Sequence, residues 1–300
     1  MGHFEPCSPN ADLPKLDDSI YEILCGPAVP EKPKGGPVTL YDREKGDAHD
    51  VAPHDALQGQ VSDCFLIASI GAVIQSHPDP DAFVKDMIKD NGDGTYTVRF
   101  FDLDAGGTTV RSVVVNSDLF KGGAHSADNK EAWAAVVEKA YIKAYGDHGT
   151  IKEGSPAFAM EHLTGLTSHA FPMAVQPELP PGLPPIPPTH ISLEALKTFH
   201  DQGYATTFLT PGPDSPITQQ PAYKANQYGE ELHAHHTYYL KDVDMAKQTV
   251  TVLNPWNHST PIVVPYADLD KVFMNGSTNP VKYASPPAGV PPYPMRGDTP

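Results

Sequence analysis

Residues 58–74 read QGQVSDCFLIASIGAVI, and the fold is decided in this stretch. From residue 64 to residue 74 the chain is apolar on every side, which is typical of a helix buried at the centre of a domain. Ser62 or Asp63 stands where a helix N-cap is expected. A buried strand is the alternative, because short apolar runs suit both structures. We therefore predict a central helix that begins at Cys64.

The rest of the first half supplies a hairpin and a second long helix. Residues 95–101 (TYTVRFF) and 108–115 (TTVRSVVV) are rich in β-branched and aromatic residues and flank a turn with glycines. They predict an antiparallel hairpin. Residues 130–145 carry apolar residues at helical spacing, and Gly146 is placed to end that helix. This half is therefore expected to be mainly helical around the central helix.

The second half has the pattern of a sheet. Residues 192–203 predict a helix, and 204–210 predict a strand. Residues 235–243 (HHTYYLKDV) and 248–256 (QTVTVLNPW) predict an antiparallel pair of strands. Before these elements, residues 172–188 contain many prolines, which favour polyproline II and cannot build a packed core. A stiff connector is favoured there over an SH3-type ligand.

Composition excludes several classes of function. The 300 residues carry a net charge of −16, and nucleic acids and anionic membranes attract basic surfaces instead. No run approaches the roughly 18–20 apolar residues that span a bilayer, and no secretory signal peptide is expected. Three cysteines, Cys7, Cys25 and Cys64, fit free thiols in a reducing compartment. We expect a cytoplasmic protein, or one delivered by a route that needs no signal peptide.

Cys64 stands where a thiol is most reactive. The positive end of a helix dipole stabilises a thiolate at the first helical residue. Such a nucleophile needs a base and a third group that orients the base. His236 and Asn254 lie on the two strands expected to pair, which would bring them side by side. The alternative for the His233–His236 cluster is a transition-metal site, but no carboxylate or cysteine lies nearby at ligand spacing.

Five segments, in order, resemble the calpain family of cysteine proteases. Residues 58–73 resemble its nucleophile motif Q-G-x-x-G-D-C-W, and 131–146 resemble its helix E-L-W-x-x-L-L-E-K-A-Y-A-K. Residues 159–166 are similar to E-x-L-x-x-L-T-G-G, 235–243 to the strand G-H-A-Y-S-V, and 253–256 to N-P-W-G. The resemblance covers about residues 40 to 275 and implies a two-lobed papain-like α+β fold. In that fold a helical N-terminal lobe surrounds the central helix, and the C-terminal lobe is rich in β-strands.

The resemblance also implies roles for single residues. Cys64 would be the nucleophile, His236 the base and Asn254 the group that orients it. Gln58 would donate to the oxyanion hole. The residues expected to contact substrate are Trp256, Phe65 and Asp63.

The chain departs from the family pattern at four positions. Ser62, His235 and Asn257 stand where the family has glycine, and Phe65 stands where it has tryptophan. A side chain in place of glycine restricts the backbone angles. These departures bear on substrate preference and rate more than on mechanism.

The expected organisation has five parts. They are an N-terminal extension (1–45), a Cys-bearing lobe (46–171), a Pro-rich connector (172–190), a β-rich lobe with His236 and Asn254 (191–285), and a disordered tail (286–300).

The expected function is that of a calpain-like cysteine endopeptidase, which hydrolyses peptide bonds by thiolate attack. Two alternatives stay open: an acyltransferase, deamidase or transglutaminase acting on glutamine side chains, and a silent peptide-binding scaffold. No cofactor and no metal are expected, with calcium left open. The expected partner is a protein or peptide substrate, with no nucleic acid and no membrane insertion. A cognate inhibitor or immunity protein, and a role as effector or toxin, are also left open.

Overall fold

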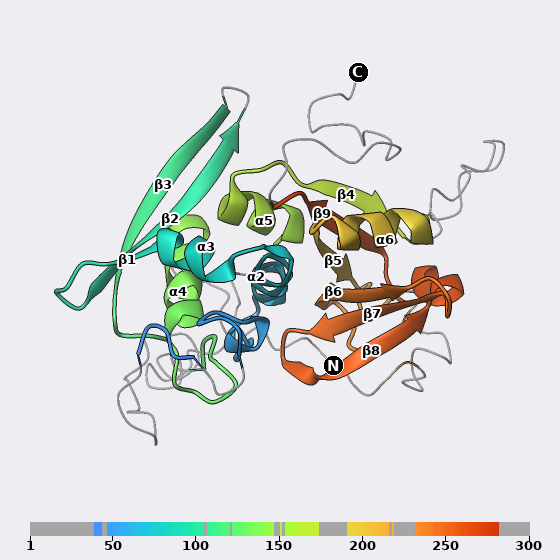
Figure 1. Cartoon of the computed structure of the whole chain (residues 1–300), viewed down its shortest axis with the longest axis horizontal. Helices are drawn as coiled ribbons and strands as arrows, with labels where there is room; N and C mark the ends of the chain where they lie inside the picture. Colours follow the sequence, from blue (N-terminus) through green and yellow to red (C-terminus); the bar gives the residue numbers. More distant parts are fainter. Residues whose placement is uncertain are drawn as a thin grey trace, which may run out of the picture.

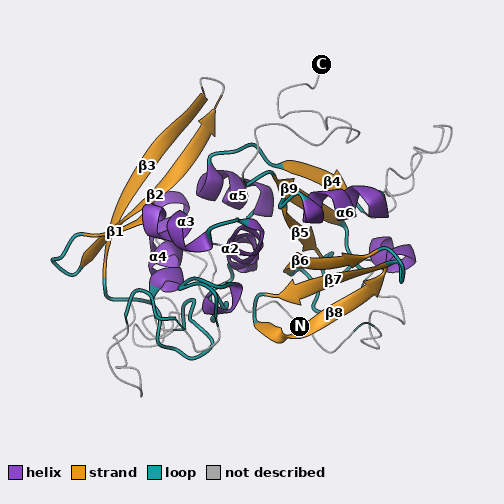
Figure 2. Ribbon diagram, viewed as in Figure 1, coloured by secondary structure: helices purple, strands orange, loops and turns teal. Residues whose placement is uncertain are grey.

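The computed structural model describes residues 39–43, 47–104, 107–120, 122–146, 151, 154–173, 191–215, 218, 228 and 232–281. The first 38 residues, with Cys7 and Cys25, lie outside these ranges, as do the connector from 174 to 190 and the tail 286–300. Helices and strands are both abundant (Figure 2), which confirms the predicted α+β class. Within the described ranges, every helix is too short or too polar to cross a membrane.

The first half of the chain is built around α2 (Cys64–Ser76), as predicted (Figure 1). Every side chain from Phe65 to Ile74 is buried, which explains why the segment is apolar on all sides. The surrounding elements are η1 (Pro53–Asp55), α3 (Pro80–Met87), α4 (Trp133–Tyr145), α5 (Pro156–Thr164) and a sheet of β1 (Ile88–Asp90), β2 (Thr95–Asp104) and β3 (Gly107–Asn116).

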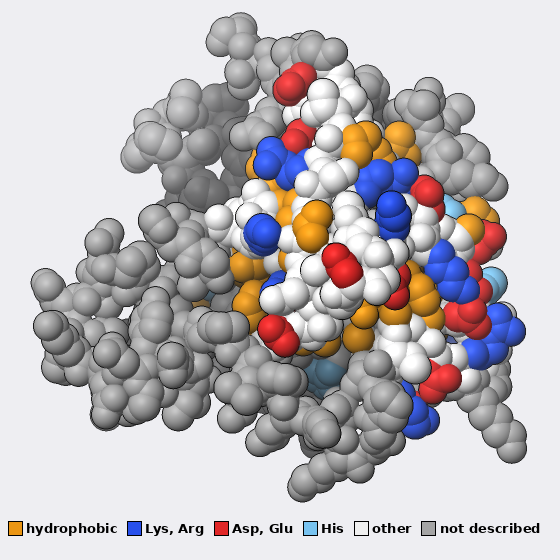
Figure 3. All heavy atoms as spheres, turned by 90° about the vertical axis from the view of Figure 1, so that its left-hand side faces the viewer, with side chains coloured by type: hydrophobic (Ala, Val, Ile, Leu, Met, Phe, Trp, Pro, Cys, Tyr) orange, Lys and Arg blue, Asp and Glu red, His pale blue; other side chains and the backbone are white. Residues whose placement is uncertain are grey.

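The predicted hairpin is formed by β2 and β3, which pair antiparallel from Thr95–Asn116 to Asp104–Gly107. On its inner face, Val98 and Phe100 are fully buried. On the opposite side, the surface of this part of the molecule shows apolar side chains between charges of both signs (Figure 3). The hairpin therefore covers the helices on one face and meets solvent on the other.

The second half contains a six-stranded antiparallel sheet in the order β4-β9-β5-β6-β7-β8. Its strands are β4 (His169–Pro172), β5 (Ala205–Leu209), β6 (Thr237–Asp244), β7 (Thr249–Asn254), β8 (Asn257–Pro265) and β9 (Asn275–Asn279), and its helices are α6 (Leu193–Asp201) and η2 (Tyr266–Lys271). The predicted strand pair is confirmed as β6 and β7. Strands β4, β8 and β9 are additions that the sequence patterns did not indicate.

Two clusters of buried apolar side chains hold these elements. The first core includes the residues of α2, and the second core fills the β-rich half. Strand β6 contributes to both, because Tyr239 belongs to the first core while Tyr238 and Leu240 belong to the second. At Gly71 of α2, a Cβ atom would lie 2.7 Å from the Tyr239 ring, so only glycine permits this approach. The two halves are thus packed through α2 and β6, while the predicted lobes and their boundaries stay predictions.

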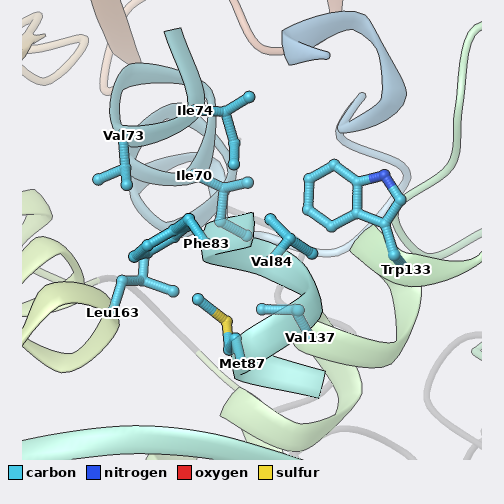
Figure 4. Close-up of a pocket in the computed structure, with 9 residues that line it drawn as sticks. All are labelled: Ile70, Val73, Ile74, Phe83, Val84, Met87, Trp133, Val137 and Leu163. Atoms are coloured by element: carbon cyan, nitrogen blue, oxygen red, sulfur yellow. The ribbon is translucent and has the colours of Figure 1, made fainter. Parts of the chain in front are cut away.

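A small cavity of about 10 Å³ lies inside the first core, between α2, α3, α4 and α5 (Figure 4). It has room for about one water molecule. Its lining is apolar: Ile70, Val73, Ile74, Phe83, Val84, Met87, Trp133, Val137 and Leu163. The cavity is therefore a packing defect and not a ligand site.

Candidate active site

Cys64 is the first residue of α2 and a free thiol, half-buried at the helix N-terminus. Asp63 is the N-cap residue, as predicted, but its side chain makes no capping hydrogen bond. The backbone carbonyl of Asp63 instead accepts the first helical bonds, from Leu66 at 2.8 Å and Ile67 at 3.1 Å. The helix therefore presents its positive end to the Cys64 sulfur.

His236 and Asn254 are brought together as predicted, but His236 lies immediately before β6 and not on the strand. His236 Nε2 lies 2.9 Å from Asn254 Oδ1, and both residues are buried. The same Oδ1 accepts the backbone N–H of Trp256 at 3.0 Å, which identifies this atom as the acceptor. Nε2 must therefore carry the proton, and Nδ1 keeps a lone pair for base chemistry.

Trp256 covers this pair. Its indole is stacked on the His236 imidazole, with ring centroids 4.0 Å apart, and its side chain is 41% exposed. His233 meets the same indole edge-on at 4.8 Å. Trp256 thus lies between solvent and the His236–Asn254 hydrogen bond.

Gln58 lies close to both halves of the site. Its backbone N–H donates to the carbonyl of Pro255 at 2.9 Å, and its side-chain Nε2 donates to the carbonyl of Val61 at 2.7 Å. An amide NH₂ has two hydrogens, so one donor remains after the bond to Val61. The structure places Gln58 on the loop before Cys64, held against the turn after Asn254.

The thiol and the imidazole each bond to another residue in this structure. Cys64 Sγ lies 3.8 Å from Thr237 Oγ1, whereas the ring of His236 bonds to Asn254. Among the described residues, no hydrogen bond joins Cys64 and His236. Burial lowers the pKa of His236 to about 4, against the opposing effect of Asn254, and it raises the pKa of Cys64. Both groups are therefore neutral at pH 7 in this arrangement.

Residues 39–262 match the calpain family cysteine protease model. The chain belongs to the calpain family. Calpain-9 of Mus musculus is 32% identical over 130 residues, which are 41% of this chain and 18% of that protein. Calpain-A of Drosophila melanogaster is 28% identical over 131 residues, or 41% of this chain and 15% of that protein. Calpain-5 of Mus musculus is 28% identical over 165 residues, which are 51% of this chain and 25% of that protein. This calpain-family chain thus matches a quarter or less of these relatives' length.

One departure from the calpain pattern has a visible structural consequence. His235, which stands where the family has glycine, has φ 54, in the left-handed region that glycine adopts without strain. Ser62 and Asn257, which also replace glycine, are not among the residues with positive φ. Strand β6 begins only at Thr237, so the expected alternation of side chains does not extend back to His235. His235 instead occupies a turn and is exposed.

The other two residues predicted to contact substrate are placed inside the fold. Asp63 is fully buried, and Phe65 is 4% exposed with its ring edge-on to Tyr141 at 6.2 Å. Gly154 covers Phe65 so closely that a Cβ atom there would lie 2.4 Å from its ring. Of the three predicted contacts, only Trp256 has a side chain that meets solvent.

Glu138, on α4, is a buried carboxyl that the sequence patterns did not single out. Its Oε1 accepts the backbone N–H of Ala124 at 3.0 Å. Burial raises the pKa of Glu138 to about 7. Burial and the neighbouring Glu138 also raise the pKa of Asp63 well above its usual range. Two buried carboxyls thus adjoin the start of the nucleophile helix. The E-K-A-Y motif contained Glu138, but its amphipathic spacing indicated only a helix.

No cluster of three metal-binding side chains occurs among the described residues. Asp55 and Glu131 are a second pair of buried carboxyls. Burial and the charge of Asp55 raise the pKa of Glu131 to about 8. The histidines considered for a transition metal make ring contacts instead, since His233 and His236 meet edge-on at 6.0 Å and both rings contact Trp256.

Proposed function

We propose that this calpain-family chain is a cysteine endopeptidase with Cys64 as nucleophile, His236 as base and Asn254 as the orienting residue. The observation that carries the proposal is the 2.9 Å bond between His236 Nε2 and Asn254 Oδ1. This bond sets the tautomer that leaves Nδ1 as a base, next to the strand residue that touches the thiol. A buried histidine with this partner is what thiol activation requires.

The reaction begins when Nδ1 of His236 accepts the thiol proton and the Cys64 sulfur attacks the peptide carbonyl carbon. The oxygen becomes negative, and the second hydrogen of Gln58 Nε2 and the N-terminal amides of α2 would stabilise it. The imidazolium then gives its proton to the leaving amine as the C–N bond breaks. Water, deprotonated by His236, hydrolyses the thioester and restores the thiol.

This cycle requires a direct contact between the thiol and the imidazole. In the structure the sulfur bonds to Thr237, the residue that follows His236. Catalytic hydrogen bonds often tighten only when substrate binds. We infer that substrate brings the sulfur from Thr237 to Nδ1 of His236.

The chemistry uses no bound cofactor, since all the proton transfers lie on Cys64 and His236. We propose that calcium is not obligatory for it. A cognate inhibitor that occupies the place of the substrate is a further partner that this chemistry would allow.

The test is mass spectrometry of a mixed peptide library incubated with the full chain and with Cys64→Ala. New peptide termini that depend on Cys64 support the endopeptidase. Deamidated or cross-linked glutamines without new termini would instead assign the chain to glutamine chemistry. An unchanged library would leave a peptide-binding scaffold, and the proposal would fail.

A further inference from the structure

Thr237 touches the sulfur of Cys64 in the structure. It is the first residue of β6, and its Oγ1 lies 3.8 Å from Cys64 Sγ. Its side chain is fully buried. Two residues further along the same face of β6, Tyr239 packs against Gly71 of α2. The packing of β6 on α2 therefore brings this hydroxyl to the start of the nucleophile helix.

The hydroxyls of nearby threonines bond to oxygen atoms, unlike that of Thr237. Thr206 bonds to the hydroxyl of Thr278 at 3.2 Å, Thr207 to the carbonyl of Ser277 at 3.5 Å, and Thr210 to the carbonyl of His233 at 2.7 Å. Each of these hydroxyls finds an oxygen on a sheet or loop neighbour. The Thr237 hydroxyl has the Cys64 sulfur as its partner. A buried hydroxyl without a partner costs free energy, so its bond to the sulfur is part of the packing of the two halves.

Which of the two groups donates the hydrogen depends on the charge of the sulfur. A thiol is a weak donor and a weak acceptor, so the neutral pair bonds in either direction. A thiolate only accepts, and the Thr237 O–H must then donate to it. Hydrogen bonds to an ionised group are stronger than bonds between neutral groups. The contact therefore favours the ionised sulfur over the neutral one.

We propose that Thr237 is a thiolate-stabilising residue, which donates its hydroxyl hydrogen to the Cys64 sulfur. The proposal deepens the proposed function and rests on it for the role of Cys64. At this position the family strand pattern G-H-A-Y-S-V has alanine, which carries no hydroxyl.

The electrostatics of the site show why such a donor matters. Burial is the largest effect on the thiol and raises the pKa of Cys64, and the charge of Asp63 acts in the same direction. The backbone N–H and the hydroxyl of Thr237 oppose both effects. The other titratable groups at this point are Glu138, paired with Asp63, and His236, which burial keeps neutral. The backbone N–H of Phe65 also lowers the pKa of Cys64, and Thr237 adds a side-chain donor that offsets burial while the imidazole remains uncharged.

The test compares the ionisation of Cys64 in variants of the full chain. The rate of Cys64 alkylation by iodoacetamide, in which the thiolate displaces iodide, is measured from pH 5 to pH 10 and mapped by mass spectrometry. Thr237→Val keeps the shape and removes the hydroxyl, and Thr237→Ser keeps the hydroxyl. Thr207→Val is the matched control, because Thr207 is also a buried sheet threonine but bonds to a carbonyl.

We expect Thr237→Val to raise the midpoint of alkylation by about one pKa unit, or about a tenfold loss of thiolate below the midpoint. Thr237→Ser and Thr207→Val are expected to stay close to the unmutated chain. If Thr237→Val does not fold, Thr237→Ala removes the hydroxyl without strain and is expected to show the same rise. Equal midpoints in the Thr237→Val and Thr207→Val chains would overturn the proposal, as would a Thr237→Ser midpoint as high as that of Thr237→Val.

This readout separates the inference from the proposed function. A raised midpoint in a chain that cuts no peptide would support the Thr237 contact and reject the endopeptidase. Peptide cleavage with an unchanged midpoint would support the endopeptidase and reject the contact.

Discussion

The backbone N–H of Gln58 donates a hydrogen bond of 2.9 Å to the carbonyl oxygen of Pro255. This bond joins the loop that precedes the nucleophile helix to the turn that follows Asn254. Gln75, at the other end of α2, donates from its side chain to the carbonyl of Leu240 at 2.6 Å. The helix that carries Cys64 is therefore tied at both ends to the sheet that carries the base. The alignment of nucleophile and base depends on these bonds and on the packing between them.

Gln58→Ala is expected to lower kcat by about 10²–10³, the usual cost of one lost oxyanion donor. The backbone bond to Pro255 is unaffected, so the fold is expected to persist. Gln60→Ala is the matched control, since Gln60 is an exposed glutamine on the same loop. Steady-state peptide cleavage measures both variants. A Gln58→Ala variant with full kcat would show that the Gln58 side chain takes no part in the mechanism.

His236→Ala is expected to lose activity by several orders of magnitude, because base and nucleophile act as a unit. His235→Gly is the control on the adjacent residue. It restores the residue of the family pattern at φ 54 and relieves a conformation that costs a non-glycine residue about 1 kcal/mol. We expect this control to keep its activity and to unfold at the same or a higher denaturant concentration. Loss of activity in His235→Gly with activity kept in His236→Ala would mean that the base is wrongly assigned.

Glu138 is expected to make stability depend on pH. Its pKa in the folded chain is raised to about 7, against roughly 4.3 for an ordinary glutamate. Its contribution is therefore fully present below about pH 4.3 and is lost as pH rises through 7, at up to about 1.4 kcal/mol for each pH unit. Between pH 5 and pH 8, Glu138→Gln is expected to lose less stability than the unmutated chain.

Urea unfolding at the two pH values measures this difference. Glu194→Gln changes an exposed glutamate of α6 and serves as the control. Equal pH dependence in the Glu138→Gln and unmutated chains would show that Glu138 ionises normally and is not held as the neutral acid.

Calcium is expected to be dispensable for peptide cleavage. The proton transfers lie on Cys64 and His236, and α2 is already tied to the sheet through Gln58 and Gln75. Cleavage is measured in excess EGTA and again in millimolar calcium. Glu131→Gln, which replaces a buried carboxyl beside Asp55 with an amide, is expected to change neither rate. Activity that appears only with calcium, and is lost in Glu131→Gln, would contradict this expectation and point to that pair of carboxyls.

The sequence alone was enough to predict the helices and strands whose pattern of apolar and polar side chains shows which of their faces are buried. The apolar run of α2 could be satisfied only by burial on all sides, and the β-branched and aromatic residues of β6 and β7 favoured a pair of strands. The pairing of those two strands brings their ends together, and His236, which immediately precedes β6, lies beside Asn254 at the end of β7. Strand β9, which reads NGSTN, has no such pattern and is a strand because β4 and β5 supply its hydrogen bonds on both edges.

Only the tertiary structure decided which atoms surround the nucleophile. The approach of Tyr239 to Gly71 sets how closely β6 lies on α2, and this approach brings the Thr237 hydroxyl to the Cys64 sulfur. The fold also encloses Phe65 and Asp63, which were expected to contact substrate. A periodic pattern reports which face of an element is buried, but it carries no information on what the face touches. Those contacts arise from the close packing of residues that are far apart along the chain.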